Sequence, residues 1–170
     1  ELIGESNQIL KIKKLISKLS STDSRVLISG PTGSGKELVA RKIHKNSNRS
    51  KNPFIVMNGA LLQSDNYEKE LFGSENKDGS VSYGFLEKAS NGTLLIDEVS
   101  EIPLDTQAKI LRVLIDQKFK RINGTKDINV NIRIISSTSK DLKSEVTMGN
   151  FREDLYPVSY THLRAHETLH

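Results

Sequence analysis

Two short motifs carry residues that could bind and hydrolyse a nucleoside triphosphate. The first, Gly30-Pro-Thr-Gly-Ser-Gly-Lys36, is a glycine-rich loop between an apolar run and an amphipathic one, which is the context of a P-loop. Glycines let backbone N–H groups turn inward around phosphate oxygens, and the N-terminus of the following helix adds a positive dipole end. Lys36 adds a charge for the β- and γ-phosphates. The residues expected to bind ATP here are Gly30, Pro31, Thr32, Gly33, Ser34, Gly35 and Lys36.

An acidic strand end supplies the second half of this chemistry. Leu94-Leu-Ile-Asp97-Glu98 is an apolar run that ends in two carboxylates, which is the Walker B pattern. Asp97 is expected to hold Mg²⁺, directly or through water, and Glu98 to orient and deprotonate the attacking water. Position 37 is Glu, where a P-loop normally has the Ser or Thr that ligates Mg²⁺. A glycine-rich turn, or a strand capped by solvated acids, is the alternative for either motif alone, but the two together favour a nucleotide site.

Hydrophobic periodicity predicts the elements that position these motifs. Helices are expected at 6–19, 37–44, 66–72 and 103–117, and buried strands at 25–29, 54–57, 93–96 and 132–135. A polar loop is expected at 74–82, and a hairpin of 119–122 with 128–130 around the turn Asn123-Gly124. Strands that alternate with helices imply a parallel sheet covered on both faces. The predicted fold is therefore α/β, a P-loop NTPase three-layer α-β-α sandwich.

The composition is typical of a soluble globular protein. The 170 residues are 35% hydrophobic and 27% charged, include no cysteine and carry a net charge of +4. No apolar run approaches the roughly 20 residues of a membrane span, and the first residues do not have the pattern expected of a signal peptide. We therefore expect a cytoplasmic protein with no membrane partner. The lysines of Lys11-Ile-Lys-Lys14 are interpreted as a solvated helix face rather than a nucleic-acid patch.

Both ends of the chain indicate a piece of a longer protein. It lacks an initiator Met, and its character changes at Pro157. Residues 157–168 resemble translated transposase sequencing adaptor, so we interpret 157–170 as adaptor read-through and 1–156 as the native domain. His162, His166 and Glu167 could mimic a metal site, but they lie in that tail. The remaining histidine, His44, is interpreted as structural.

Residues 2–156 resemble the central AAA+ ATPase domain of bacterial enhancer-binding proteins, the sigma-54 activators of the NtrC type. The resemblance implies an AAA+ fold, C-terminally truncated and without its lid, in a ring oligomer whose ATP site is shared between subunits. It also makes Glu37 a mark of the family, in which Glu follows the P-loop Lys. The segments that carry it are Leu2-Ile-Gly-Glu-Ser6, Gly33-Ser-Gly-Lys-Glu-Leu-Val-Ala40, Ile43-His44, Pro53-Phe54, Glu70-Leu-Phe-Gly73, Gly92-Thr-Leu-Leu-Ile-Asp-Glu98, Gln107-Ala-Lys-Ile-Leu-Arg-Val-Leu114 and Phe151-Arg-Glu-Asp-Leu-Tyr156.

Further roles follow from this resemblance, one position at a time. Asn58 matches the family Asn that holds the catalytic Glu inactive until ATP and partner are in place. Thr138 and Ser139 fall at the sensor I position, where the family usually has Asn at the second place. Arg152 matches an arginine finger that reaches the ATP of the neighbouring subunit, where it would stabilise transition-state charge. A salt bridge between Arg152 and a nearby acid is the structural alternative.

One departure from the family pattern bears on the partner. Sigma-54 activators carry a GAFTGA loop after Glu-Leu-Phe-Gly, whereas 74–87 is a shorter segment without that motif. The combination resembles NtrX-type response regulators that lack the loop, so we expect ATPase chemistry without the sigma-54 contact. A full protein of that type would carry a receiver domain before residue 1 and a DNA-binding helix-turn-helix after this segment, acting on the transcription machinery.

Several functional hypotheses stay open at this point. The first is an oligomeric ATPase whose hydrolysis drives remodelling in transcription control. The second is a module in which ATP tunes assembly and DNA binding with little hydrolysis. A sigma-54 activator with a degenerate contact loop is a variant of the first. An unrelated AAA+ machine, such as a helicase loader, is disfavoured by Glu70-Leu-Phe-Gly73 and by 151–156.

Overall fold

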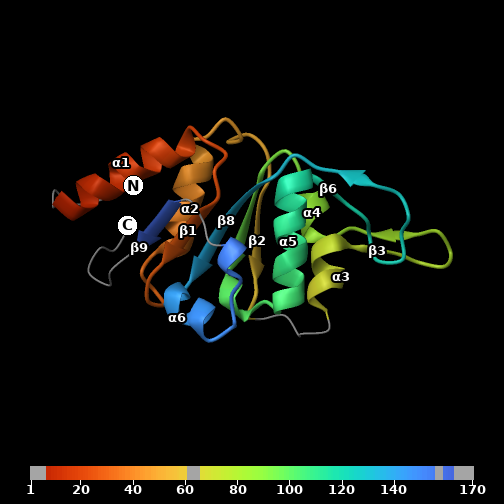
Figure 1. Cartoon of the computed structure of the whole chain (residues 1–170). Helices are drawn as coiled ribbons and strands as arrows, with labels where there is room; N and C mark the ends of the chain where they lie inside the picture. Colours follow the sequence, from red (N-terminus) through yellow and green to blue (C-terminus); the bar gives the residue numbers. More distant parts are fainter. Residues whose placement is uncertain (1–6, 61–65, 156–158, 163–170) are drawn as a thin grey trace.

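A parallel β-sheet forms the centre of the molecule and separates two layers of helices (Figure 1). The computed structural model describes residues 7–60, 66–155 and 159–162. The sheet has five strands in the order β2-β5-β8-β1-β9, and all neighbours are parallel. These strands are β1 (Val26–Ser29), β2 (Phe54–Asn58), β5 (Thr93–Asp97), β8 (Arg133–Thr138) and β9 (Ser159–His162). The predicted parallel sheet is confirmed.

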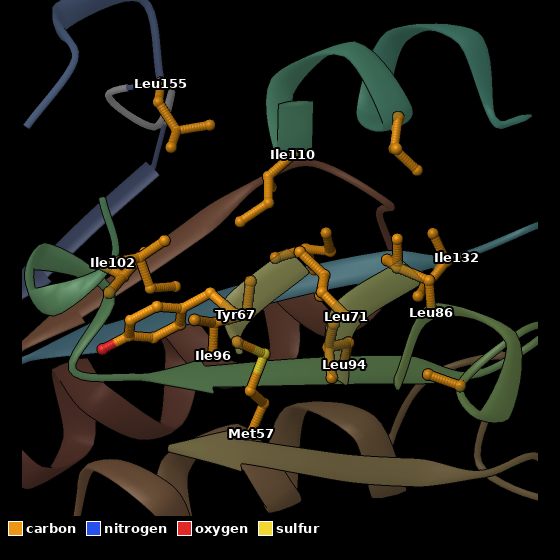
Figure 2. Packing of buried hydrophobic residues seen from close by; sticks show 14 of the residues in the cluster. Met57, Tyr67, Leu71, Leu86, Leu94, Ile96, Ile102, Ile110, Ile132 and Leu155 are labelled. Carbon is orange, nitrogen blue, oxygen red and sulfur yellow. The ribbon is translucent and has the colours of Figure 1, made fainter. Parts of the chain in front are cut away.

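Helices cover both faces because the central strands are apolar on both sides. One face packs α1 (Asn7–Ser20) and α2 (Lys36–Lys45) against residues that include Ile28 and Leu95. The other packs α3 (Tyr67–Phe72), α4 (Phe85–Lys88) and α5 (Leu104–Asp116) around Leu94 and Ile96 (Figure 2). Successive residues of β5 thus enter opposite apolar clusters, as the alternation of side chains along a strand requires. The three-layer sandwich is confirmed.

Short elements connect these layers. They are the hairpin of β3 (Ser74–Glu75) with β4 (Val81–Ser82), η1 (Val99–Glu101), the hairpin of β6 (Lys118–Phe119) with β7 (Ile128–Asn129), α6 (Leu142–Thr147) and η2 (Glu153–Leu155). Within the described ranges, every helix is too short or too polar to cross a membrane.

The polar segment 74–82 is a β-hairpin rather than the predicted loop, so that prediction is wrong at both of its ends. Ser74 pairs with Ser82 and Glu75 with Val81. The turn between them is built from local polar contacts, because the Asp78 carboxylate accepts from the backbone N–H of Ser80 at 2.9 Å. Gly79 supplies the positive φ of 89° that closes the turn. Apolar periodicity does not reveal a strand this short, whose pairing depends on turn chemistry.

The second hairpin is present, but its pairing is shorter than predicted. The turn occurs at Asn123-Gly124, where Asn123 has a φ of 65° and the Gly124 N–H reaches the Arg121 carbonyl at 2.9 Å. The strands, however, pair only at Lys118–Phe119 with Ile128–Asn129. Ile122 instead bonds across to the first hairpin, since its N–H donates to Gly73 and its carbonyl accepts from Glu75, both at 2.9 Å. A competing backbone partner therefore ends the predicted ladder early.

Strand β9 lies in the segment interpreted as adaptor read-through, where the sequence analysis expects no strand. It pairs with β1 from Val26↔Ser159 to Ser29↔His162. The pairing satisfies the outer edge of β1, whose backbone groups would otherwise be unpaired. His162 is in this strand, whereas His166 and Glu167 lie outside the described residues. The non-native origin of 157–170 stays a prediction.

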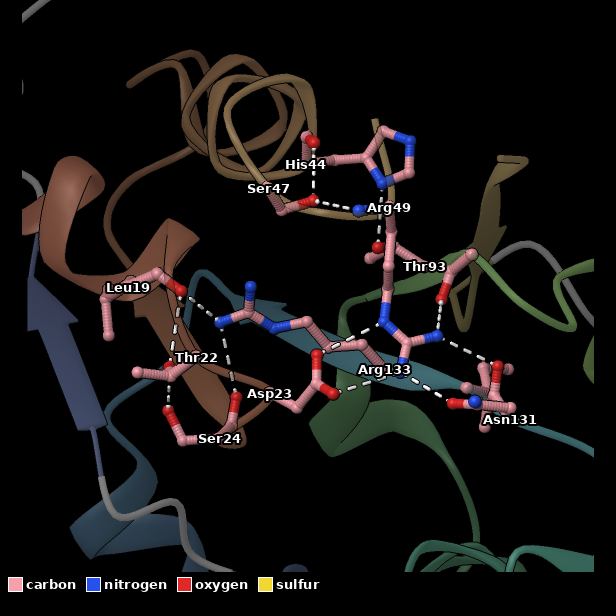
Figure 3. Close-up of polar contacts among 12 residues, drawn as sticks. Leu19, Thr22, Asp23, Ser24, His44, Ser47, Arg49, Thr93, Asn131 and Arg133 are labelled. Atoms are coloured by element: carbon pink, nitrogen blue, oxygen red, sulfur yellow. Dashed lines mark hydrogen bonds and ion pairs between the residues drawn. The ribbon is translucent and has the colours of Figure 1, made fainter. Parts of the chain in front are cut away.

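Arg49 ties together the amino ends of the strands, at the edge of the sheet opposite the P-loop (Figure 3). Its guanidinium donates to both carboxylate oxygens of Asp23 at 3.2 Å, to the Gly92 carbonyl at 3.2 Å and to the Asn131 carbonyl at 2.9 Å. Asp23 precedes β1, Gly92 precedes β5 and Asn131 precedes β8. One planar side chain thus fixes the start of three strands whose far ends carry the nucleotide motifs.

Candidate nucleotide-binding site

The P-loop has the geometry of a phosphate cradle between β1 and α2. Gly33 and Gly35 adopt φ values of 83° and 90°, conformations that other residues rarely accept. The loop leads directly into α2, which begins at Lys36, so the free N–H groups of the helix N-terminus face the loop. Its first residue is anchored across the sheet, because the Gly30 N–H donates to the Thr138 carbonyl at 3.2 Å. Pro31 and Thr32 lie exposed at the top of the loop.

Two side chains of the loop have chemistry suited to a phosphate. The Lys36 ammonium is buried, with the residue 8% exposed, and donates to the carbonyls of Gly30 at 2.8 Å and Pro31 at 3.1 Å. The Ser34 hydroxyl is buried without a hydrogen-bond partner among the described residues, although buried polar groups are nearly always paired. A lysine held by its own loop and an unsatisfied hydroxyl fit the oxygens of a triphosphate. The donor set therefore fits the phosphates of a nucleoside triphosphate.

Glu37 lies away from this cradle. Its carboxylate accepts from Arg41 Nε at 3.0 Å on the outer side of α2, and about half of each side chain is exposed, 51% and 52%. In this arrangement Glu37 makes a surface ion pair between residues one helical turn apart.

The Walker B carboxylates lie where β5 ends, and each is held by a serine of the β8 end. Asp97 Oδ1 accepts from Ser137 Oγ at 2.5 Å and from the Glu98 N–H at 3.1 Å. Glu98 Oε2 accepts from Ser139 Oγ at 3.1 Å. Glu98 itself has a φ of 55°, a sparsely populated conformation for a residue with a side chain. The backbone turn thus sends the two neighbouring carboxylates to different partners.

A row of paired residues brings these parts together at one edge of the sheet. Asn58 pairs with Asp97, Asp97 with Ser137, and Ser137 with Ile28. Neighbouring strands lie roughly 4.8 Å apart, so the backbone of Asp97 is about 10 Å from that of Ile28, two residues before the P-loop. The structure therefore places the P-loop and the Walker B end together.

The residues expected at the sensor I position, Thr138 and Ser139, and the residue expected to hold Glu98 inactive, Asn58, differ in their contacts. Thr138 is fully buried and its hydroxyl lies 3.2 Å from that of Ser100, while Ser139 contacts Glu98. Asn58 lies beside Asp97 in register, but its side-chain oxygen accepts from the Ala60 N–H at 2.9 Å. The contact of Glu98 among the described residues is thus with Ser139, not with Asn58.

Arg152 is not drawn into this cluster within the chain. Its guanidinium donates to the Asp154 carboxylate at 2.9 and 2.6 Å, and its side chain is 40% exposed. This pairing holds the pKa of Asp154 below its ordinary value. Its backbone is fixed, because the Arg152 N–H donates to Gln107 Oε1 at 2.9 Å. The side chain is therefore a surface group on a positioned backbone.

Two residues that contact the site are not singled out by any sequence motif. One is Ser137, whose contact with Asp97 depends on strand register and leaves no local motif. The other is Gly59, where an added Cβ would lie 2.7 Å from the Glu98 carbonyl. Its position directly after the second strand is the only signal in the sequence. Among the described residues, no group of three or more His, Asp or Glu side chains is arranged to hold a metal ion.

Comparisons with known proteins agree with this geometry. The family model described as the sigma-54 interaction domain matches residues 2–162. The nitrogen assimilation regulatory protein NtrX of Azorhizobium caulinodans is 45% identical over 156 residues, which cover 91% of this chain and 34% of that protein. The regulatory protein AtoC of Escherichia coli is 45% identical over 167 residues, 95% of this chain and 36% of that protein. The crystal structure of NtrX from Brucella abortus in complex with ATP matches with a TM-score of 0.88 and 44% identity, covering 96% of this chain and 38% of that one. The chain thus spans about a third of the length of the curated relatives.

Proposed function

The chain belongs to the family of sigma-54 interaction domains, and on this premise we propose that it binds and hydrolyses Mg-ATP as the AAA+ module of an NtrC/NtrX-type transcription regulator. The observation that carries the proposal is the buried Ser34 hydroxyl, which has no partner in the described part of the chain and lies in the same loop as Lys36, at the sheet edge that carries Asp97 and Glu98. The relative from Brucella abortus whose structure contains ATP supports the same ligand for this chain.

Each residue of the site has a distinct task in this proposal. Lys36 and the N–H groups from Gly33 to Lys36 hold the β- and γ-phosphates, and Asp97 holds Mg²⁺ directly or through water. The bound Mg-ATP supplies a phosphoryl group whose charge the metal partly neutralises. Glu98 takes the proton of the attacking water. Ser137 and Ser139 orient Asp97 and Glu98, and the Thr138 carbonyl keeps the P-loop in register with β8.

The ATP site is proposed to be shared in a self-assembled ring, with Arg152 of one subunit completing the site of its neighbour. Exposed ion pairs contribute little to stability, so the pair of Arg152 with Asp154 can be exchanged for a phosphate at low cost. In the free subunit, Asp154 would then hold the Arg152 side chain until the neighbouring subunit binds. Stabilisation of transition-state charge from a neighbour is a known use of arginine.

The biological output is proposed to be transcription control without direct sigma-54 activation. The shorter segment that replaces the GAFTGA loop is closed into the β3–β4 hairpin, whose nearest aromatic residue, Tyr83, lies beyond the hairpin. DNA binding would come from a helix-turn-helix in the rest of the parent protein. Reconstituted transcription should then yield no sigma-54 open complexes, and their formation would support an activator with a degenerate loop.

A second function is favoured by the contact of Ser139 with Glu98. This hydrogen bond at 3.1 Å could keep Glu98 away from the attacking water, so that ATP tunes assembly and DNA binding with little hydrolysis. The two functions differ in whether turnover follows binding.

A comparison of Glu98→Gln with Lys36→Ala separates these proposals. Glu98→Gln should keep the affinity for a fluorescent ATP analogue and lower steady-state phosphate release by about 100-fold or more, the usual contribution of a general base. Lys36→Ala should lose the binding itself. Glu70→Gln is the matched control, because Glu70 is exposed on α3 and its substitution changes the same charge. Turnover by Glu98→Gln equal to that of the control would show that the ATPase proposal is wrong and leave the ATP-tuned module.

A further inference from the structure

A small apolar groove with a basic rim is lined by residues of α5, the end of α3 and β6. These three elements lie on the same side of the molecule, away from β1 and α2, which flank the P-loop (Figure 1). The volume of the groove is about 230 Å³. The apolar residues of its lining are Phe72, Val113, Phe119 and Ile122. The rings of Phe72 and Phe119 are 5.6 Å apart, and both residues are buried. Phe72, Val113 and Phe119 of this lining belong to the hydrophobic core, whereas Ile122 is half-buried.

The rim of this groove is entirely basic. Its charged residues are Lys109, Arg112, Lys118 and Lys120, all exposed, and no acidic residue lines the groove. Lys109 pairs with Glu68 at 2.6 Å and Lys120 with Asp127 at 2.7 Å, both outside the lining. Arg112 and Lys118 make no ion pair with any described residue, although Asp116 follows Arg112 by one helical turn. The charge of Lys118 also helps to lower the pKa of Asp127, so the groove keeps a positive charge that neighbouring acids offset only in part.

We propose that this groove is a docking site for an acidic segment of a partner protein that carries an apolar anchor residue. The volume is below the roughly 300–1,000 Å³ of small-molecule pockets, so it suits one or two apolar side chains rather than a cofactor. Around such an anchor, carboxylates would meet Arg112 and Lys118, and complementary charge favours encounter and register.

Nucleic acid fits the same groove less well. Single-stranded nucleic acid needs exposed aromatic faces for base stacking and a groove that follows its backbone. Here both phenylalanine rings are buried, and the cations surround a pit instead of forming a stripe. The proposal is independent of ATP, because none of the lining residues belongs to the P-loop or to the ends of β5 and β8.

A binding assay with defined probes tests the proposal. The probe is a fluorescein-labelled peptide of alternating Asp and Glu around a central Leu-Phe pair, titrated with the purified chain and followed by anisotropy. We expect saturable binding that weakens about tenfold in Arg112→Glu/Lys118→Glu, the loss expected for two rim charges. The same charge change at Lys11 and Lys14, exposed on α1, is the control and should leave binding unchanged. A peptide with Ser-Ser in place of Leu-Phe should bind much more weakly.

Four results would overturn this assignment. They are no saturable binding at millimolar peptide, equal weakening in the Lys11→Glu/Lys14→Glu control, equal binding of the Ser-Ser peptide, and stronger binding of a thymidine oligonucleotide than of the acidic peptide. Sedimentation of both double variants completes the test. A change of assembly state confined to Arg112→Glu/Lys118→Glu would identify a second copy as the occupant and reject a partner protein.

Discussion

At the scale of single residues, Ser137 is the contact that most directly connects the fold with the proposed chemistry. Its hydroxyl is buried and fixes one oxygen of Asp97, which leaves the other oxygen for Mg²⁺ or its water. Groups that orient a metal ligand commonly change metal affinity or activity by 10–100-fold. Ser137 is therefore a positioning residue for the Walker B carboxylate.

Ser137→Ala should raise the Mg²⁺ concentration needed for half-maximal ATP hydrolysis by about tenfold. The carboxylate of Asp97 would lose its hydrogen bond from the Ser137 hydroxyl. The smaller alanine methyl group still fits the buried position. A Mg²⁺ titration of phosphate release gives the readout, and Ser137→Thr should restore most of the wild-type response because it returns a hydroxyl. Identical Mg²⁺ curves for Ser137→Ala and wild type would mean that the contact has no positioning role.

His44 shows how a buried side chain makes stability depend on pH. Its Nδ1 lies 2.8 Å from Thr93 Oγ1 and its Nε2 lies 3.0 Å from the Asn52 carbonyl. Because a carbonyl can only accept, Nε2 carries the proton in the neutral ring. Desolvation by burial is the main cause that lowers the pKa of His44 below its ordinary value of 6.5, and the charges of Arg133 and Arg49 act in the same direction.

The free energy of unfolding should therefore fall when the pH drops from 7.5 to 6.0. The unfolded chain binds more protons than the folded chain in the range between the lowered pKa and 6.5, so stability rises with pH there. The contribution of neutral His44 to stability is fully present above the pKa of the unfolded chain, 6.5. It is lost as the pH falls from there through the lowered pKa of the folded chain. Urea unfolding at the two pH values gives the difference, which should shrink in His44→Gln. An unchanged pH dependence in that variant would assign the effect to other groups.

At the scale of elements, strands β1, β2, β5 and β8 are predictable from sequence because they are short apolar runs between recognisable helices, whereas the polar edge strand β9 is not. The predicted strand at 93–96 and helix at 103–117 agree with β5 and α5 to within a residue or two. The P-loop and the Asp97-Glu98 pair are also predictable, since their chemistry lies within single short segments. What fails depends on contacts between segments, such as the diversion of Ile122 to the first hairpin and the contact of Ser137 with Asp97. Register and competition for backbone partners leave no local periodicity.

The hydrogen bonds of Arg49 to Asp23, Gly92 and Asn131, here called the Arg49 clamp, lead to a prediction about the stability of the sheet. Arg49→Lys should lower the free energy of unfolding by about 2 kcal/mol, because a lysine cannot reproduce the forked bonds to Asp23, Gly92 and Asn131. For a chain of this size the midpoint of thermal unfolding should fall by about 5 °C. Arg112→Lys is the matched control, since that side chain is exposed and makes no ion pair with any described residue. Equal shifts for both variants would mean that the clamp contributes no more than a surface arginine.

At the scale of the whole molecule, the described residues gather the groups proposed to bind the phosphates, Mg²⁺ and the attacking water, whereas the proposed arginine finger lies elsewhere. Lys36, Asp97 and Glu98 gather at one edge of the sheet, while Arg152 stays paired with Asp154 at the surface. A head-to-tail contact, in which one surface patch meets a different patch of the next copy, closes into a ring when the rotation allows. Such a contact would bring Arg152 of each copy to the P-loop of the next.

Mixing two inactive variants tests this arrangement. Arg152→Ala keeps an intact P-loop, and Lys36→Ala keeps an intact finger, so an equal mixture contains some interfaces in which both are intact. Random assembly makes that about one interface in four, and hydrolysis should recover to about a quarter of the wild-type rate. The double variant Lys36→Ala/Arg152→Ala, mixed with either single variant, forms no such interface and should give no recovery. Activity that stays at the level of the single variants, in mixtures whose assembly is confirmed by sedimentation, would confine Arg152 to its surface ion pair and rule out a shared site.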